Sequence, residues 1–244
     1  MYPILFSIGN VNFYTHGLLI AIGSLVGGLV IFYIAKKEQL TTNFLFDLLI
    51  FSLFAGVIGA RITYVILYYY QVRNWHDMFL IWYGGLVSFG GIIAGFLVAG
   101  LILKNKKQNI LRWFDIGIIG LLLGWAFGRI GCLLSGDVLG ITSVARIAIW
   151  GRVPVTLFES IWSVILAGSL FLLLRYRHKL LQNWGNGIIF YLGLGGYALG
   201  RFVIDFFREE SVLYILKSGQ ITSLILLIII IFIIAYRYFR RSNA

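Results

Sequence analysis

The sequence has little charge and almost no cysteine for its length. Only 12% of its 244 residues are charged, whereas 60% are hydrophobic and the mean hydropathy is +0.94. A soluble protein of this size has no place to bury so much apolar surface, so a water-soluble globular fold is excluded. The one cysteine, Cys132, cannot form an internal disulfide.

Two further absences narrow the class of membrane protein. Residues 1–12 contain no lysine or arginine, and the apolar run that follows is long enough to span a bilayer. We therefore expect no cleaved leader. The apolar runs also lack the alternation of apolar and polar residues that outward-facing barrel strands require, which argues against strands as the spanning elements.

Long apolar runs are what the sequence has in quantity. A helix needs about 20 apolar residues to cross the hydrocarbon core of a bilayer. Seven stretches meet this requirement, approximately at 13–35, 46–70, 82–103, 114–134, 154–174, 186–205 and 219–236. The sequence therefore predicts an all-α, polytopic protein with about seven transmembrane helices, forming a single transmembrane domain over 1–244.

The distribution of basic residues predicts the orientation. One set of alternate loops and tails carries 12 lysines and arginines, and the other set carries 5. Because positive loops stay in the cytoplasm, we expect the N-terminus outside and the C-terminus inside. The net charge of +11 comes from short clusters at helix ends, which anchor to anionic membrane lipids. A nucleic-acid partner is therefore not expected.

Three arginines, Arg61, Arg129 and Arg201, lie inside predicted spans. A charge at the bilayer centre costs at least about 2.5–3.5 kcal/mol, so such residues usually face the bundle interior or a wet cavity. All three fall in the outer half of their spans. We expect their guanidiniums to meet in a polar chamber open to the outer leaflet; the alternative is that each one snorkels to the interface.

Other polar residues and glycines are predicted at the same depth. They are His16, Gly84, Gly85, Gly90, Gly91, Asp137, Gly140, Pro154, Glu159 and Asp205. Guanidinium offers a planar fork of donors that fits phosphate. Arginines at headgroup depth therefore predict a site for a phospholipid phosphate.

Tyr197, Arg201, Asp205 and Arg208 share one helical face, since they are spaced at i, i+4, i+8 and i+11. Asp205 is expected to hold Arg201 in position, and Tyr197 to add a hydrogen bond. The alternative is an ion pair that only stabilises packing. In either case, the spacing predicts that these side chains act together.

His16 is a candidate proton acceptor, because its ordinary pKa of about 6.5 suits that task. The alternative, which is the more frequent case for a lone histidine at a membrane interface, is an interfacial polar residue. We interpret Cys132 as a small helix-packing residue rather than a nucleophile, since no histidine is near it in the sequence. The three histidines lack metal-ligand spacing, so we expect no metal site and no cofactor.

At these motifs the sequence resembles the prolipoprotein diacylglyceryl transferases over almost its whole length. The matching segments, in chain order, are Phe6-Ser7-Ile8-Gly9; Gly59-Ala60-Arg61-Ile62 with Tyr64; Gly84-Gly85 to Gly90-Gly91; Gly128-Arg129-Ile130-Gly131 with Gly136-Asp137 and Gly140; Pro154, Leu157 and Glu159; Gly196-Tyr197 to Arg201 and Asp205-Phe206-Phe207-Arg208-Glu209; and Ser218-Gly219-Gln220. Each is weak alone, but the ordered set is specific.

The resemblance implies an activity and a location. Family members transfer the diacylglyceryl group of phosphatidylglycerol to the lipobox cysteine thiol of a prolipoprotein and release glycerol phosphate. The expected partners are phosphatidylglycerol, the prolipoprotein signal-peptide region and membrane lipids, in a bacterial cytoplasmic (inner) membrane. We predict catalytic roles for Arg129, Arg201, His16 and Asp137. Substrate-binding roles are predicted for Arg61, Tyr197, Asp205, Gly140, Glu159, Gly90 and Gly91.

The chain departs from the family pattern at several positions. Phe89 stands where a histidine is frequent, Cys132 where the signature often has asparagine, and His16 where tyrosine is frequent. The stretch after Gly140 is short, which implies a reduced outer head segment around 135–153. Three alternatives therefore stay open: a related transferase with another acceptor, a non-catalytic lipid-binding protein, and a transporter.

Overall fold

The computed structural model describes residues 2–9, 11–71, 75–79, 85–181, 184–209, 212–213 and 216–242. Within these ranges, seven helices are long and apolar enough to cross a membrane, which confirms the predicted class and number of spans. Many large apolar side chains point outward, among them Leu25, Phe46 and Phe232, which are 69%, 74% and 71% exposed. Such side chains would face lipid rather than water.

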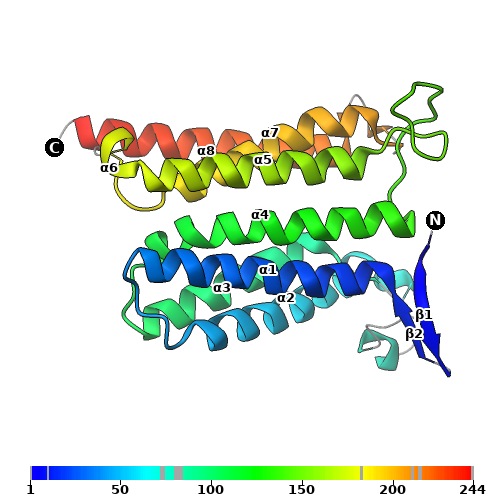
Figure 1. Ribbon diagram of the computed structural model, residues 1–244, viewed down its shortest axis with the longest axis horizontal. Coiled ribbons are helices and arrows are strands. Elements are labelled where there is room, and N and C mark those ends of the chain that lie inside the picture. The colour runs from blue at the N-terminus through cyan, green and yellow to red at the C-terminus, as the bar shows by residue number, and fades with distance from the viewer. Residues whose placement is uncertain are drawn as a thin grey trace. The chain divides into compact units, whose positions relative to one another are not determined.

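The spanning helices agree with the predicted ranges at most of their ends (Figure 1). They are α1 (Thr15–Lys37), α2 (Leu45–Leu67), α3 (Ser88–Asn105), α4 (Ile110–Ser135), α5 (Val155–Arg175), α7 (Ile188–Ile204) and α8 (Ser218–Ser242). The third helix begins later than predicted, because the chain at Gly85 has a positive φ of 76° and is not helical. Gly84 and the predicted start of this span lie outside the described residues.

Short elements connect the spans. Two antiparallel hairpins, β1 (Ile4–Ile8) with β2 (Val11–Tyr14) and β3 (Val212–Leu213) with β4 (Leu216–Lys217), lie outside the membrane-spanning helices. A four-residue helix, α6 (Arg177–Leu180), follows α5, and a 3-10 helix (Asp205–Phe207) follows α7. The first hairpin lies against the end of α4, since the Tyr2 amide donates to the Leu134 carbonyl at 2.6 Å.

The chain divides into two compact units, Met1–Ile34 with Phe114–Ala244, and Ala35–Trp113. In the first unit, α1 and α4 meet along a seam of four glycines. A methyl group on Gly23 would lie 2.5 Å from the Gly124 carbonyl oxygen, and one on Gly27 would lie 2.5 Å from that of Gly120. The two backbones are therefore in direct contact, as small residues permit in membranes. We keep a single domain over 1–244 as a prediction.

The rest of the first unit packs α5 against α4 and α7. The Ser160 hydroxyl donates to the Ala126 carbonyl at 3.0 Å, and Trp162 Nε1 donates to the Gly196 carbonyl at 2.9 Å. Each bond joins two helices through a backbone carbonyl that already accepts within its own helix. These bonds fix the depth of α5, which carries the central residue of the candidate site.

In the second unit, α2 and α3 also meet through glycines. A methyl group on Gly59 would lie 2.7 Å from the Gly90 carbonyl oxygen, and one on Gly91 would lie 2.9 Å from that of Gly56. Here Gly90 and Gly91 serve close helix packing. Their predicted role in substrate binding stays a prediction.

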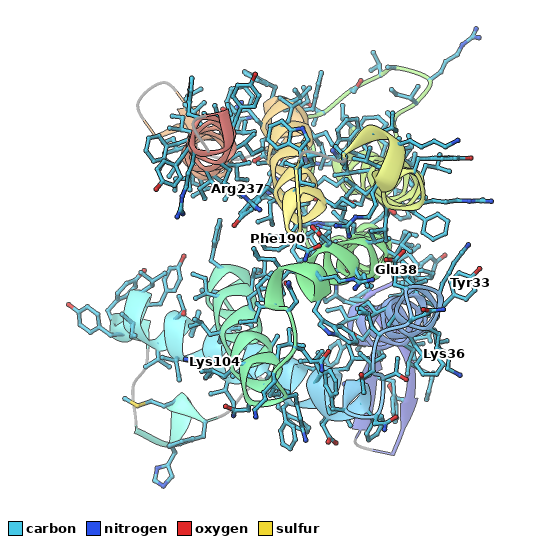
Figure 2. The ribbon with its side chains drawn as sticks, turned by 90° about the vertical axis from the view of Figure 1, so that its left-hand side faces the viewer. Tyr33, Lys36, Glu38, Lys104, Phe190 and Arg237 are labelled. Atoms are coloured by element: carbon cyan, nitrogen blue, oxygen red, sulfur yellow. The ribbon has the colours of Figure 1, made fainter. Side chains whose placement is uncertain are left out.

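One end of the first unit is closed by a buried acid that the sequence analysis overlooked. Asp115, 1% exposed, accepts the Gly187 amide at 2.7 Å and the Phe190 amide at 2.8 Å. These amides belong to the first turn of α7, whose donors have no partner within the helix. Near this end, Arg237 Nη2 donates to the Asn186 carbonyl at 2.7 Å. Arg237 of α8 and Phe190 of α7 are labelled in Figure 2.

Candidate functional site

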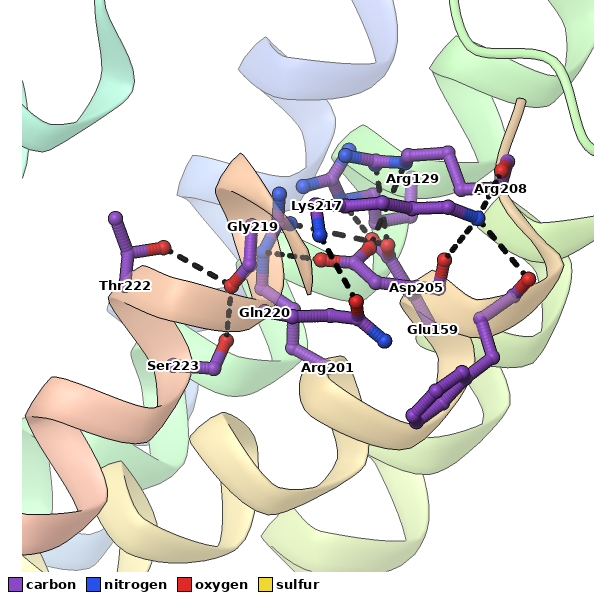
Figure 3. Close-up of polar contacts among 11 residues, drawn as sticks. Arg129, Glu159, Arg201, Asp205, Arg208, Lys217, Gly219, Gln220, Thr222 and Ser223 are labelled. Atoms are coloured by element: carbon purple, nitrogen blue, oxygen red, sulfur yellow. Dashed lines mark hydrogen bonds and ion pairs between the residues drawn. The ribbon is translucent and has the colours of Figure 1, made fainter. Parts of the chain in front are cut away.

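The carboxylate of Glu159 lies at the centre of a buried ionic cluster in the first unit (Figure 3). Glu159 is 2% exposed and sits in the second turn of α5, after Pro154. Its Oε2 lies 2.6 Å from Arg129 Nε on α4. Its Oε1 lies 3.2 Å from Arg208 Nη2 and 3.8 Å from Arg201 Nη1 on α7. One carboxylate thus gathers three arginines from three segments of the chain.

Asp205, fully buried, is the second acid of the cluster. It lies 3.6 Å from Arg201 Nε through Oδ2 and 3.6 Å from Arg208 Nε through Oδ1. The predicted positioning of Arg201 by Asp205 is therefore present in the structure. The shared helical face is wrong in its last member: α7 ends at Ile204, and Arg208 is extended after the 3-10 helix, yet its side chain still reaches both acids.

The start of α8 completes the cluster around Asp205. Gly219 lies so close that a methyl group there would sit 3.1 Å from Asp205 Cγ and 3.4 Å from Arg201 Nη2. The N-terminal end of a helix carries partial positive charge, which favours a carboxylate beside it. Lys217 Nζ donates to the Asp205, Phe206 and Arg208 carbonyls at 2.8, 3.0 and 2.5 Å. It thereby satisfies carbonyls in and directly after the 3-10 helix that follows α7.

Aromatic rings surround the arginines. The Arg129 guanidinium carbon lies 4.7 Å from the Trp125 ring centre, and the Trp125 and Tyr197 rings meet edge to face at 5.7 Å. Tyr197 also makes a side-chain hydrogen bond with Arg201, as the sequence predicts. These contacts hold the planes of two guanidiniums in fixed orientations.

The cluster has an excess of positive charge. The three guanidiniums and the two carboxylates carry a net charge of +1, to which Lys217 adds a further positive charge. The Arg201 contacts with the two acids, at 3.8 and 3.6 Å, are ion pairs longer than the 2.7–3.2 Å of a direct N–H···O bond. Arg201 is 18% exposed at the side chain and Arg129 12%. The arrangement can bind an anion such as a phosphodiester.

A second cluster lies where α1 and α4 reach the same end of the unit. His16 Nδ1 lies 3.5 Å from Cys132 Sγ and 3.7 Å from Asp137 Oδ2. The Ser135 hydroxyl donates to Asp137 Oδ2 at 2.5 Å. The second unit separates His16 from Cys132 in the sequence, so the contact between them is one that sequence proximity could not indicate.

Arg129 connects the two clusters, since it contacts Cys132 as well as Glu159. A surface cavity of about 200 Å³ is lined by Asp137, Val138, Leu139, Arg208 and Glu209. Its lining includes Asp137 of the second cluster and Arg208 of the first.

The remaining predicted site residues have other surroundings. Gly140 pairs its backbone with Arg208, and its carbonyl accepts from Arg152 Nη1 at 3.2 Å. Arg61 belongs to the second unit, where it donates to the Met78 carbonyl at 3.0 Å and to the Gly85 carbonyl at 2.9 Å. The expected meeting of Arg61 with Arg129 and Arg201 stays a prediction.

Two residues of the first cluster were missing from the predicted site, Arg208 and Lys217. Both were counted as loop cations on the outer side. The available signal was the short Asp-Phe-Phe-Arg segment after α7, in which Arg208 follows Asp205 by three residues. Its link to Glu159 depends on how α5 and α7 pack, which sequence spacing alone does not give.

Comparison with known proteins identifies the family of the chain. The family described as prolipoprotein diacylglyceryl transferase matches residues 3–236. A phosphatidylglycerol–prolipoprotein diacylglyceryl transferase of Clostridium botulinum (strain Loch Maree / Type A3) is 31% identical over 251 residues, covering 96% of each chain. The enzyme of that name from Streptococcus uberis is 31% identical over 250 residues, covering 96% of this chain and 95% of its own. The one from Staphylococcus aureus (strain Newman) is 31% identical over 255 residues, covering 96% and 88%. The chain belongs to the prolipoprotein diacylglyceryl transferase family.

Proposed function

We propose that this protein transfers the diacylglyceryl group of phosphatidylglycerol to the lipobox cysteine thiol of a prolipoprotein and releases glycerol phosphate. The observation that carries the proposal is the buried cluster of Arg129, Arg201 and Arg208 around Glu159 and Asp205, with its net charge of +1. Family membership supplies the two substrates.

The cluster would act on the leaving group. When the bond between glycerol carbon and phosphate oxygen breaks, negative charge grows on the departing phosphate. Donors already aimed at that charge stabilise the transition state more than the ground state. Arg129 and Arg201 would supply these donors, while Glu159 and Asp205 hold the guanidiniums apart in a fixed geometry.

The protein would work in the bacterial cytoplasmic membrane, with the site facing the outer leaflet. The loop charge difference of 12 against 5 supports this orientation. Both substrates, a phospholipid and an exported prolipoprotein, are present at that surface. Asp137, which lines the surface cavity, and Gly140 would lie along the approach of the protein substrate.

The test is direct. Purified protein is incubated with phosphatidylglycerol and a lipobox peptide, and glycerol phosphate release is followed together with the mass of the peptide. We expect release only when both substrates are present, with one diacylglyceryl group added per peptide. Binding of phosphatidylglycerol without release would instead favour a non-catalytic lipid-binding protein. Release without modification of the peptide would point to another acceptor.

A further inference from the structure

We propose that His16, Cys132 and Asp137 form a zinc site that activates the acceptor thiol. The inference rests on the proposed function for its role but not for the site itself. It reverses the expectation of no metal site, which considered only spacing along the chain.

The ligand set is the first argument. His16 offers a ring nitrogen, Cys132 a sulfur and Asp137 a carboxylate oxygen, and these atoms all lie within 4.8 Å of one another. Zn²⁺ binds these three donor types, and catalytic zinc sites combine three protein ligands with one open position. The three residues fit that pattern without any further group from the chain.

The distances are the second argument. A tetrahedral Zn²⁺ with Zn–S of ~2.3 Å and Zn–N of ~2.0–2.1 Å places its sulfur and nitrogen ligands about 3.5 Å apart. His16 Nδ1 and Cys132 Sγ lie 3.5 Å apart. The nitrogen and oxygen ligands of such a site lie about 3.4 Å apart, against 3.7 Å between His16 Nδ1 and Asp137 Oδ2. The third pair, Cys132 Sγ and the Asp137 carboxylate, lies within 4.8 Å, so the exposed Asp137 side chain would move toward the other two ligands to close the site.

The direction of the ring nitrogen distinguishes a metal site from a Cys–His–Asp catalytic triad. In a triad, the two nitrogens of the imidazole face different partners, one the nucleophile and one the acid. Here the same atom, His16 Nδ1, faces both Cys132 and Asp137. Three donor atoms within 4.8 Å of one another, with one ring nitrogen facing the other two, suit a coordination site better than a triad.

Burial and support also suit a metal. Cys132 is buried at 7% exposure, whereas the His16 and Asp137 side chains are 36% and 51% exposed, which leaves a side open to water. The Ser135 hydroxyl donates to the ligating Asp137 oxygen at 2.5 Å, a partner of the kind that orients metal ligands. Gly131 brings α4 close to α1, since a methyl group there would lie 3.2 Å from His16 Nδ1.

The open position would receive the lipobox cysteine. A thiol that coordinates Zn²⁺ is deprotonated outright, so the peptide thiol gives its proton to water as it binds. The thiolate sulfur then forms a bond to the glycerol carbon of phosphatidylglycerol. The carbon–oxygen bond breaks, glycerol phosphate leaves with the electron pair, and the neutral thioether dissociates from the metal. No oxidation or reduction occurs.

The position relative to the arginine cluster fits this order of events. Arg129 contacts Cys132 and also pairs with Glu159, so one side chain separates the thiol site from the phosphate site. Asp137 and Arg208 line the same surface cavity. A nucleophile held on the zinc and a leaving phosphate held on the arginines would approach the same glycerol carbon.

The first experiment tests the site without using activity. Chelator-treated wild-type protein in detergent is titrated with Zn²⁺ against a chromogenic chelator, and with Co²⁺ to observe thiolate-to-cobalt absorption. We expect one equivalent of each metal and a thiolate band. His16→Phe, Asp137→Asn and Cys132→Ser should bind Zn²⁺ at least about 100-fold more weakly, because even outer partners of metal ligands are worth 10–100-fold. His76→Phe, a histidine of the second unit, is the control and should bind as wild type.

Several results would overturn the site. Stoichiometric zinc binding that survives all three variants would place the metal elsewhere, and absence of binding by folded wild-type protein would remove the proposal. Folding of each variant is checked by its thermal transition, and Cys132→Ser keeps the side-chain size. Cobalt binding without a thiolate band would exclude Cys132 as a ligand.

The second experiment tests the role. Metal removal should slow peptide modification at neutral pH by at least about tenfold, because a thiol of pKa about 8.5 is only ~3% ionised there. Zn²⁺ should restore the rate in wild type but not in Cys132→Ser. Full activity of metal-free wild type would overturn thiol activation. A protein that binds zinc at the cluster yet never modifies the peptide would refute the proposed function and leave the metal site standing.

Discussion

Glu159 Oε2 lies 2.6 Å from Arg129 Nε, and this pair is the shortest ionic contact at the centre of the buried cluster. Because Glu159 also faces Arg201 and Arg208, its single negative charge opposes the mutual repulsion of three guanidiniums. Glu159 therefore holds the three arginines of the cluster together.

Glu159→Gln should therefore damage both stability and activity. Removing the charge leaves three arginines with one carboxylate, and breaking a buried ion pair typically costs about 3–5 kcal/mol. We expect a clearly lowered thermal midpoint in detergent and strongly reduced glycerol phosphate release. Glu209→Gln is the control: Glu209 pairs with Arg152 and is 53% exposed, so its loss should cost under about 1 kcal/mol. A wild-type midpoint in Glu159→Gln would contradict the central role of this acid.

Arg201→Lys should fold but lose most activity. Lysine keeps the charge but has no planar fork of donors for phosphate. The measurement is kcat/KM for phosphatidylglycerol. Arg175→Lys, in the last turn of α5, is the matched control and should be unaffected. Full activity in Arg201→Lys would show that Arg201 does not bind phosphate through two donors, and wild-type activity in Asp205→Ala would remove the positioning role of Asp205.

Gly219→Ala should disturb the cluster through shape alone. The added methyl group would collide with Asp205 Oδ2 and lie 3.4 Å from Arg201 Nη2, so the start of α8 must move. We expect activity to fall at least tenfold with no change of charge. Gly168→Ala on α5 is the control, since a methyl group there meets nothing within 4 Å. Equal activity of the two variants would show that the approach of α8 to Asp205 is not required.

Asp115→Ala should reduce stability without changing the chemistry. It leaves the Gly187 and Phe190 amides without their buried acceptor, a loss of about 1–3 kcal/mol. The activity of the folded fraction should stay at the wild-type value, because Asp115 lies near the opposite end of α4 from Arg129. Thermal unfolding and activity are measured on the same preparation. Loss of activity with an unchanged midpoint of thermal unfolding would contradict a purely structural role of Asp115.

Reporter fusions test the orientation. Fusions after Lys106 and Arg177 should report the cytoplasm, and fusions after Trp75 and Arg146 should report the outside, because the basic loops face inward. A consistent inversion would place both clusters at the inner surface. The outer-leaflet site would then be lost with the orientation.

The sequence was sufficient to predict the membrane-spanning helices and part of the candidate site. Apolar runs identify membrane helices because the bilayer leaves few alternatives, and Arg129 and Arg201 stood out because charge is costly there. The hairpin at Ile4–Ile8 and Val11–Tyr14 was not foreseen, since its residues carry no strong periodic signal.

The missed contacts are those between distant segments. Glu159 was predicted as a site residue, but its simultaneous contact with α4 and α7 depends on helix packing that no local pattern encodes. The same holds for His16 beside Cys132, which are 116 positions apart. Arg208 was counted as a loop cation, and its contact with Glu159 likewise depends on how α5 packs against α7 and the segment after it.

The glycine seam between α1 and α4 restricts how a lipid can enter. Gly23 touches Gly124 and Gly27 touches Gly120 backbone to backbone, so no space is left there for an acyl chain. A phosphatidylglycerol molecule diffusing in the bilayer cannot slide its tails between these two helices. Its lateral route to Arg129 must pass another pair of helices, and the seam acts as a wall that closes one side of that route.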